Sequence, residues 1–275
     1  MKKTKSIIIY NNKKFELDLN NRYDISIPVN FNDTQPNFYG SEIAKMKPFK
    51  SKKVTWSVLD GASCNVPEIT MNIHCNGTHT ECVGHLLSNY KSIGSILNDI
   101  LVPSLLITVK SSKIENSKEK YHKDNIKDEL FITSQTIKKE ILNSRCDEFS
   151  GLIIRTQPNT KLKLNSCYPE KKYPFLSNDA VKFLNEIGLE HLFIDTPSID
   201  RYDDDGILGN HRIFWSKNDN LNSELNFSSN KTITEFCYIS NKIKDGFYFV
   251  NLQLPNFKLD AAPSRPILIK TKLLQ

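Results

Sequence analysis

Residues 74–85 concentrate side chains that can bind metal ions. The segment reads His-Cys-Asn-Gly-Thr-His-Thr-Glu-Cys-Val-Gly-His, so three of the chain's six histidines and one glutamate fall within twelve residues. Neutral imidazole nitrogen and carboxylate oxygen are ligands that borderline divalent ions such as Zn²⁺ and Mn²⁺ accept, and several must converge to offset desolvation of the ion. One short loop could therefore supply most of a metal site.

The spacing within this segment favours convergence on one side of the chain. Alternate side chains of an extended backbone point to the same face, so His79 and Glu81 share a face and His85 can reach the same cavity. Gly77 supplies the backbone freedom that a turn before His79 requires. The alternative, that each histidine only bonds a neighbouring carbonyl, fits a lone histidine better than a cluster with an acid.

The same segment resembles the signature His-x-Gly-Thr-His-x-Asp-x-Pro-x-His of the cyclase family of metal-dependent hydrolases, which includes bacterial kynurenine formamidases and isatin hydrolases. Gly77, Thr78, His79 and His85 match it position for position. Four further segments resemble conserved parts of that family: residues 23–28, 36–40, 152–156 and 194–200. The resemblance implies a swivelling β/β/α fold, assembled as a homodimer or homotetramer with pocket residues near a subunit interface.

The resemblance also implies which residues do the chemistry. In the family the acid of the signature bridges two metal ions, and a late histidine and a late glutamate complete the site. Carried over, this makes His79, Glu81, His211 and Glu235 ligands of two divalent ions, Zn²⁺ or Mn²⁺. His85 would transfer protons as the catalytic acid or base and would not bind metal.

Three departures from the signature affect the ligand set. Its first histidine aligns with Cys75, and His74 lies one residue earlier. Either the loop bulges so that His74 binds the ion, which we favour, or Cys75 binds as a thiolate and selects Zn²⁺. Glu81 replaces the aspartate and Val83 the proline, so the bridge shifts by one methylene but no ligand is lost. A polar stretch at 216–231 resembles an inserted loop that could reshape the pocket.

The chemistry predicted from these ligands is hydrolysis. Bound divalent ions lower the pKa of water and polarise a carbonyl, so an amide, formamide, lactam or ester carbon of a small molecule would be the target. His85 would take the proton from water and deliver it to the leaving group. Related lactone or dehydration chemistry is one alternative. A metal-binding protein of the same fold that has lost catalysis is another, because the departures at 74 and 81 lie in the ligand set itself.

Other residues could shape the pocket. Phe38, Tyr39 and Trp56 could line an aromatic wall, although aromatic side chains in such segments more often belong to a core. Arg265 could bind a substrate carboxylate or face solvent. His122 and His191 lie in ordinary surroundings.

The elements that would position these residues are those of a mixed α/β domain. Amphipathic helices are predicted at 134–143, at 178–188 and, after His85, at 86–97. Residues 110–129 are dense in charged and polar side chains, which predicts a solvated excursion. Strands are predicted at 6–10, 14–19, 70–74, 105–109, 152–156, 191–194, 246–252 and 266–270. We expect one domain over residues 1–275 with a mixed sheet.

Composition excludes several classes of protein. With 275 residues, 39% hydrophobic and 25% charged, the chain is long enough for a substantial core and has the composition of an ordinary globular protein. Its net charge of +6 includes no basic stripe interleaved with aromatics, so we expect no nucleic-acid partner, and no apolar run could enter a membrane. Six cysteines without a paired framework predict free thiols in a reducing cytoplasm.

Overall fold

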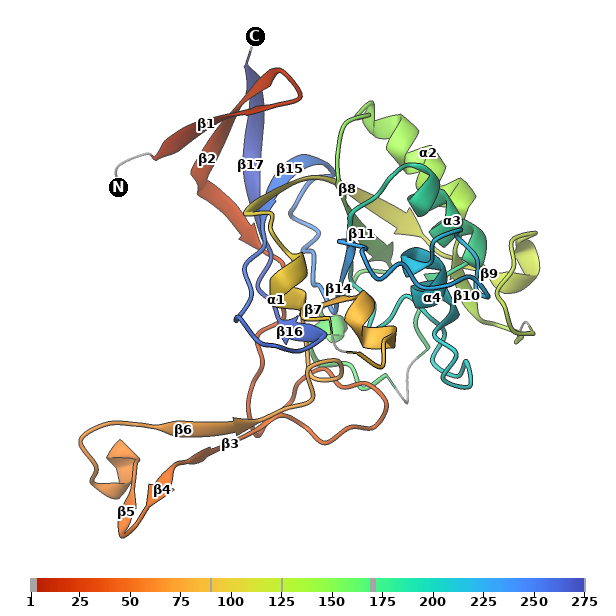
Figure 1. The fold of residues 1–275 in the computed structure, drawn as a ribbon. Coiled ribbons are helices and arrows are strands. Elements are labelled where there is room, and N and C mark those ends of the chain that lie inside the picture. The colour runs from red at the N-terminus through yellow and green to blue at the C-terminus, as the bar shows by residue number, and fades with distance from the viewer. Residues whose placement is uncertain (1–3, 90, 125, 169–171, 275) are drawn as a thin grey trace.

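The computed structural model describes residues 4–89, 91–124, 126–168 and 172–274. One mixed sheet dominates it, with strands in the order β1-β2-β17-β15-β8-β11-β13-β14-β7-β16 (Figure 1). Their bounds in that order are Lys5–Tyr10, Lys13–Asp24, Ile267–Leu274, Gly246–Asn251, Leu101–Lys110, Gly151–Gln157, His191–Ile194, Thr232–Glu235, His79–Cys82 and Ala261–Pro263. The neighbours β8, β11, β13 and β14 run parallel, and the flanking pairs are antiparallel. The expectation of a mixed sheet in an α/β fold is confirmed.

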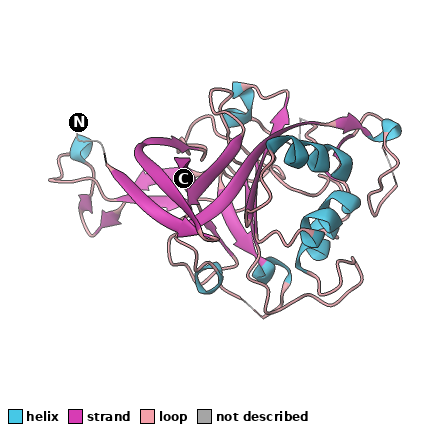
Figure 2. Ribbon diagram, turned by 90° about the horizontal axis from the view of Figure 1, so that it is seen from above, coloured by secondary structure: helices cyan, strands magenta, loops and turns pink. Residues whose placement is uncertain are grey.

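The parallel centre of the sheet is buried on both faces. Leu152, Ile153 and Ile154 of β11 are fully buried, and alternate residues pack into different apolar clusters. Helices α2 (Ser134–Ser144) and α3 (Asn178–Glu186) cover one face, where Figure 2 shows the longer helices together. The carboxyl ends of the parallel strands lie together along one edge of the sheet. In open α/β sheets, ligands bind at this edge.

The two predicted helices with capping signals are present. The Ser177 side chain accepts the N–H of Ala180 at the start of α3, and Gly188 follows its end with φ of 70°. Thr133, one residue before the predicted start, caps α2. Among the described residues, no helix has the length and hydropathy needed to cross a lipid bilayer.

Two predicted elements are wrong. The strand expected at 70–74 ends at Thr70, because the Asn72 side chain accepts the N–H of His74 at 3.1 Å and turns the chain. Of the helix expected at 86–97, the described residues form only α1 (Ile93–Ile96), preceded by a 3-10 turn at Val83–Leu86, and residue 90 lies outside the described residues. Gly94 packs so closely on residue 256 that an added Cβ would lie 2.6 Å from its side chain. Tertiary contacts thus override the helical pattern.

Outside the main sheet, the chain forms an irregular excursion, an arm and three small sheets. The described part of 110–129 is mostly irregular, as expected. However, Ile114 and Tyr121 are buried in an aromatic cluster, so this excursion does contribute to the core. A second feature is an arm, residues 45–70, that reaches away from the sheet (Figure 1). The remaining strands are β9 (Ser112–Lys113), β10 (Leu130–Ile132) and β12 (Phe175–Leu176) in one ladder, and β3 (Lys45–Pro48), β6 (Pro67–Thr70), β4 (Lys50–Ser51) and β5 (Val54–Thr55) in the arm.

Candidate metal centre

Strand pairing brings the early motif and the late glutamate together. In the antiparallel pair of β7 and β14, His79 lies directly opposite Glu235, and Glu81 follows on the same face of β7. Gly77 has φ of 139° in the turn before β7, where an added Cβ would lie 3.2 Å from Val29. The turn that the sequence predicted at this glycine is therefore present.

The late histidine reaches the same place from helix α4 (Gly209–Trp215). Asp200 holds the start of this helix, because its Oδ1 accepts the N–H of Asn210 at 2.7 Å. Oδ2 of the same carboxylate accepts Nδ1–H of His211 at 2.6 Å, which turns Nε2 of the ring toward Glu81. Asp200 thus orients a predicted ligand and also holds the start of the helix that carries it.

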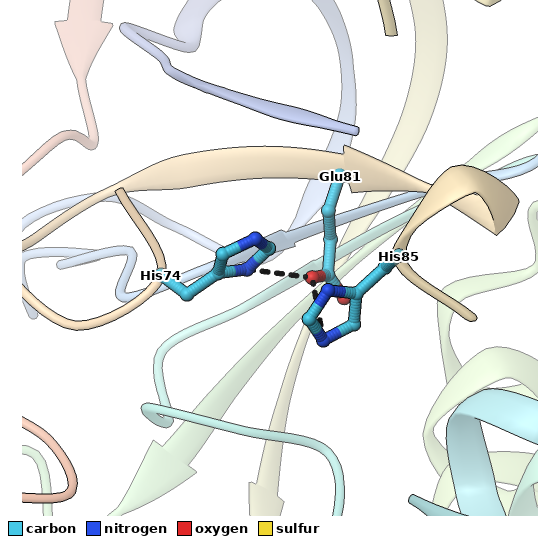
Figure 3. Close-up of side chains that lie close together, drawn as sticks. All are labelled: His74, Glu81 and His85. Carbon is cyan, nitrogen blue, oxygen red and sulfur yellow. Dashed lines mark ion pairs between the residues drawn. The ribbon is translucent and has the colours of Figure 1, made fainter. Parts of the chain in front are cut away.

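The carboxylate of Glu81 lies at the centre of the cluster and faces two groups of side chains. Its Oε1 lies 2.8 Å from Nε2 of His211, which is itself 3.5 Å from Oε1 of Glu235. Its Oε2 lies 3.1 Å from Nδ1 of His74 and 3.8 Å from Nε2 of His85, as Figure 3 shows. These contacts form two overlapping sets of potential ligands that share Glu81, the geometry expected of a bridging acid.

One ligand atom at this site, Nε2 of His79, is buried without a hydrogen-bond partner among the described residues. Nε2 of His211 and Oε1 of Glu81 are also buried and face each other at 2.8 Å, as an ion pair without hydrogen-bond geometry. Nδ1 of His79 donates to the carbonyl of Gly77 at 3.0 Å, so its Nε2 lone pair points inward, 3.7 Å from Oε2 of Glu235. Buried polar atoms are almost always paired, so an imidazole lone pair left open beside two carboxylates fits a divalent cation.

The protonation of the histidines agrees with different roles. Burial lowers the pKa of His79 to about 4, and the charge of His74 adds to the effect. His79 is therefore a neutral imidazole, the form that binds metal. Burial also opposes the charged form of His74, but hydrogen bonds to Asp260 and Glu81 outweigh it and raise its pKa to about 10. In the protein alone, a proton on His74 takes the place of a cation beside Glu81.

The surroundings shift the pKa values of the two glutamates in opposite directions. Burial opposes ionisation of Glu81, yet the charges of His85 and His211 hold its pKa well below the usual value. Burial raises the pKa of Glu235, and repulsion from Glu81 contributes. An acid pair this deeply buried is costly without compensating positive charge, which divalent ions would supply.

The six predicted metal-binding and catalytic residues lie in this one cluster: His74, His79, Glu81, His85, His211 and Glu235. Cys75 lines the same cavity but belongs to none of the groups of potential ligands among the described residues. Its thiol packs in an apolar cluster with Phe38 and Phe236, and burial raises its pKa. The structure therefore brings His74, and not Cys75, to Glu81.

One residue of the cluster escaped the sequence analysis. Asp260 contacts both His74 and His85 at 3.0 Å. No local pattern marks it, because its position depends on the pairing of β16 with β7, more than 170 residues apart in the chain.

A cavity of about 320 Å³ opens onto the cluster, with Phe38 and Tyr39 in its wall. Tyr39 stacks on Tyr202, with ring centroids 5.1 Å apart. Trp56 lies on the arm, away from this cavity, and the exposed Arg265 pairs with Asp24 at 2.6 Å. The inserted stretch at 216–231 contributes nothing to the described lining, so the expected reshaping of the pocket is absent there.

Comparisons with known proteins agree with this geometry. The chain is 28% identical over 170 residues to a kynurenine formamidase of Bacillus thuringiensis subsp. konkukian, which covers 61% of this chain and 68% of the relative. It is 29% identical over 168 residues to the kynurenine formamidase of a Bacillus cereus strain, with the same coverage.

Solved structures share the fold. A predicted metal-dependent hydrolase from Bacillus stearothermophilus superposes with a TM-score of 0.56 at 18% identity, covering 90% of this chain and 98% of that one. Isatin hydrolase A from Labrenzia aggregata gives a TM-score of 0.61 at 13% identity, covering 92% and 94%.

The family match is more direct. The Cyclase family, described as "Putative cyclase", matches residues 23–201, well over half of the chain. That range contains the motif at 74–85 and Asp200, and the structure adds His211 and Glu235 from outside it. The chain belongs to the Cyclase family.

Proposed function

We propose that this protein is a metal-dependent hydrolase that cleaves an amide, formamide, lactam or ester carbonyl of a small molecule. The observation that carries the proposal is the two-sided environment of Glu81, with ring nitrogens of His74 and His211 on separate carboxylate oxygens. Relatives named kynurenine formamidase and a fold shared with an isatin hydrolase support carbonyl hydrolysis.

The proposed ligands of the metal are His74, His79, Glu81, His211 and Glu235. We favour two ions of the Zn²⁺ or Mn²⁺ type on the basis of charge. The carboxylates of Glu81 and Glu235, and those of Asp200 and Asp260 behind the histidines, offer about four negative charges, which two divalent cations would balance. When bound, such ions lower the pKa of water and polarise a carbonyl.

His85 is proposed as the proton carrier. Its side chain keeps 23% of its surface exposed, whereas His79 and His211 are sealed at 1% and 2%. Its Nε2 lies 3.8 Å from Glu81, within the cavity where a substrate carbonyl would sit. A group in this position can take a proton from the attacking water and deliver it to the leaving nitrogen or oxygen. A protein that only stores metal would have no use for it.

Removal of metal tests the proposal. We expect the purified protein to contain about two equivalents of divalent metal by elemental analysis, and chelation to abolish hydrolysis of N-formyl-kynurenine, isatin or a simple ester. Added Zn²⁺ or Mn²⁺ should restore it. Metal at 100 times its Kd should also stabilise the fold by about 3 kcal/mol in thermal unfolding. A protein that binds metal but hydrolyses none of these carbonyl classes would favour the non-catalytic alternative.

We also propose that the chain assembles as a homodimer or homotetramer. The arm at 45–70 supports this, because an isolated two-stranded ladder is marginally stable and this one exposes Met46, Val58, Leu59 and Ile69. Light scattering at micromolar concentration should give at least twice the chain mass of 31.6 kDa. A monomeric mass would contradict the assembly and leave the metal site untouched.

The remaining proposals concern the setting of the enzyme. Residues 1–275 are proposed to act as one domain, since strands from both ends of the chain join the same sheet. The partner is a small-molecule substrate, with neither nucleic acid nor membrane. A cytoplasmic location is supported by the six cysteines, all of which are free thiols in the structure.

A further inference from the structure

A single carboxylate oxygen connects two histidines of the cluster that the proposed function assigns to different roles. Oδ2 of Asp260 lies 3.0 Å from Nε2 of His74 and 3.0 Å from Nδ1 of His85. The two rings stack with centroids 4.2 Å apart and planes 27° apart. Asp260 therefore contacts the rings through different nitrogens.

The backbone fixes Asp260 at this position independently of any side-chain contact. The residue directly precedes β16, in which Ala261 pairs with Glu81 of β7, and its carbonyl accepts the N–H of Cys82 at 3.1 Å. On the other side, Gly84 packs so tightly that an added Cβ would lie 3.3 Å from Cβ of Asp260 and 2.1 Å from the carbonyl of residue 91. The carboxylate is thus held in place before any metal binds.

An ionised carboxylate only accepts hydrogen bonds, so each ring nitrogen that faces Asp260 carries a hydrogen. For His74 this makes Nδ1, which faces Glu81 at 3.1 Å, the nitrogen whose hydrogen a metal ion would replace. For His85 it leaves Nε2 facing Glu81 at 3.8 Å. His79 and His211 differ from His74, because they use Nδ1 for their outer contacts and present Nε2 to the site.

We propose that Asp260 is a positioning residue that selects the tautomers of His74 and His85, so that His74 binds metal through Nδ1 and His85 moves protons through Nε2. This inference rests on the proposed function. It explains how two adjacent, stacked imidazoles can do different work: one carboxylate fixes opposite nitrogens as donors.

Nitrogen-15 NMR of the histidine rings in the zinc-loaded protein tests the assignment directly, because the chain has only six histidines. We expect the wild-type spectrum to show hydrogen on Nε2 of His74 and on Nδ1 of His85. Hydrogen on Nδ1 of His74, or on Nε2 alone of His85, would overturn the proposal. This measurement needs neither a substrate nor a variant, so it stands even if no hydrolysis is found.

The variant Asp260→Ala adds a functional readout. It removes the oxygen that both rings share, so neither tautomer is fixed any longer, while the backbone pairing of β16 is kept. We expect kcat to fall about 10- to 100-fold with little change in KM, and zinc affinity to fall by a similar factor. Asp24→Ala, which removes an exposed pair with Arg265, is the matched control and should behave as wild type.

Two outcomes of this comparison would contradict the inference. Unchanged ring signals of both His74 and His85 in Asp260→Ala would show that the carboxylate does not select their tautomers. Changed signals of His79 and His211 to the same extent would show a general collapse of the site instead of positioning. If wild type itself hydrolyses nothing while the ring signals respond as expected, the proposed function fails and the tautomer assignment holds.

Discussion

Replacing His79 with alanine is expected to remove the metal and the activity together. Its ring is 1% exposed, its Nε2 has no hydrogen-bond partner among the described residues, and its pKa of about 4 keeps it neutral. A buried, neutral imidazole with an open Nε2 is expected of a preformed metal ligand. In a structural histidine, a buried ring nitrogen would normally have a hydrogen-bond partner. Because metal ions supply several kcal/mol of transition-state stabilisation, and about 1.4 kcal/mol corresponds to tenfold, kcat should fall at least about 10³-fold.

The measurement is metal content by elemental analysis beside kcat, with His191→Ala as the matched control. His191 is also buried, but it lies at the amino-terminal end of β13, opposite the end that faces the cluster, and there it contacts Thr232 and Asp99. Its variant should lose stability without losing metal. Full metal occupancy in His79→Ala would show that the cluster binds ions without this residue, and the ligand set would have to be redrawn around Glu81 and His211.

The early part of the site could be predicted because its members are close together in the chain. His79 and Glu81 share a face of a short strand, as alternation requires, and Gly77 makes the turn before them. His211 and Glu235 were accessible only through the family resemblance, since nothing local distinguishes a histidine in the first turn of α4 or a glutamate at the end of β14.

The features that the sequence did not reveal depend on long-range pairing. Asp260 reaches the cluster only because β16 pairs with β7. Packing sets the register of this pair, and no periodic pattern in the sequence indicates it. The same cause explains the missing helix after His85, where contacts with residues 255–260 replaced the local preference. By contrast, α3 was predicted because its amphipathic pattern and the terminal Gly188 lie within the segment itself.

His85→Ala should separate chemistry from metal binding. Its Nε2 lies 3.8 Å from Glu81, farther than the nitrogens of His74 and His211, and its Nδ1 is committed to Asp260. Its loss therefore leaves the proposed ligands in place while removing the group that can move a proton. General acid–base catalysis contributes about 10²- to 10⁴-fold, so kcat should fall by that factor while the metal content stays at the wild-type level.

The comparison with His79→Ala makes the result decisive, because one variant should lose metal and the other should keep it. The rings of His85 and His74 stack, and both contact Asp260. A fold defect caused by the lost stacking would therefore appear as a lower thermal stability of His85→Ala, which should be measured beside kcat and metal content. Wild-type hydrolysis by His85→Ala would refute the proton-carrier role. Its isolation without metal would instead make His85 a ligand, an arrangement that the grouping of His74, Glu81 and His85 allows geometrically.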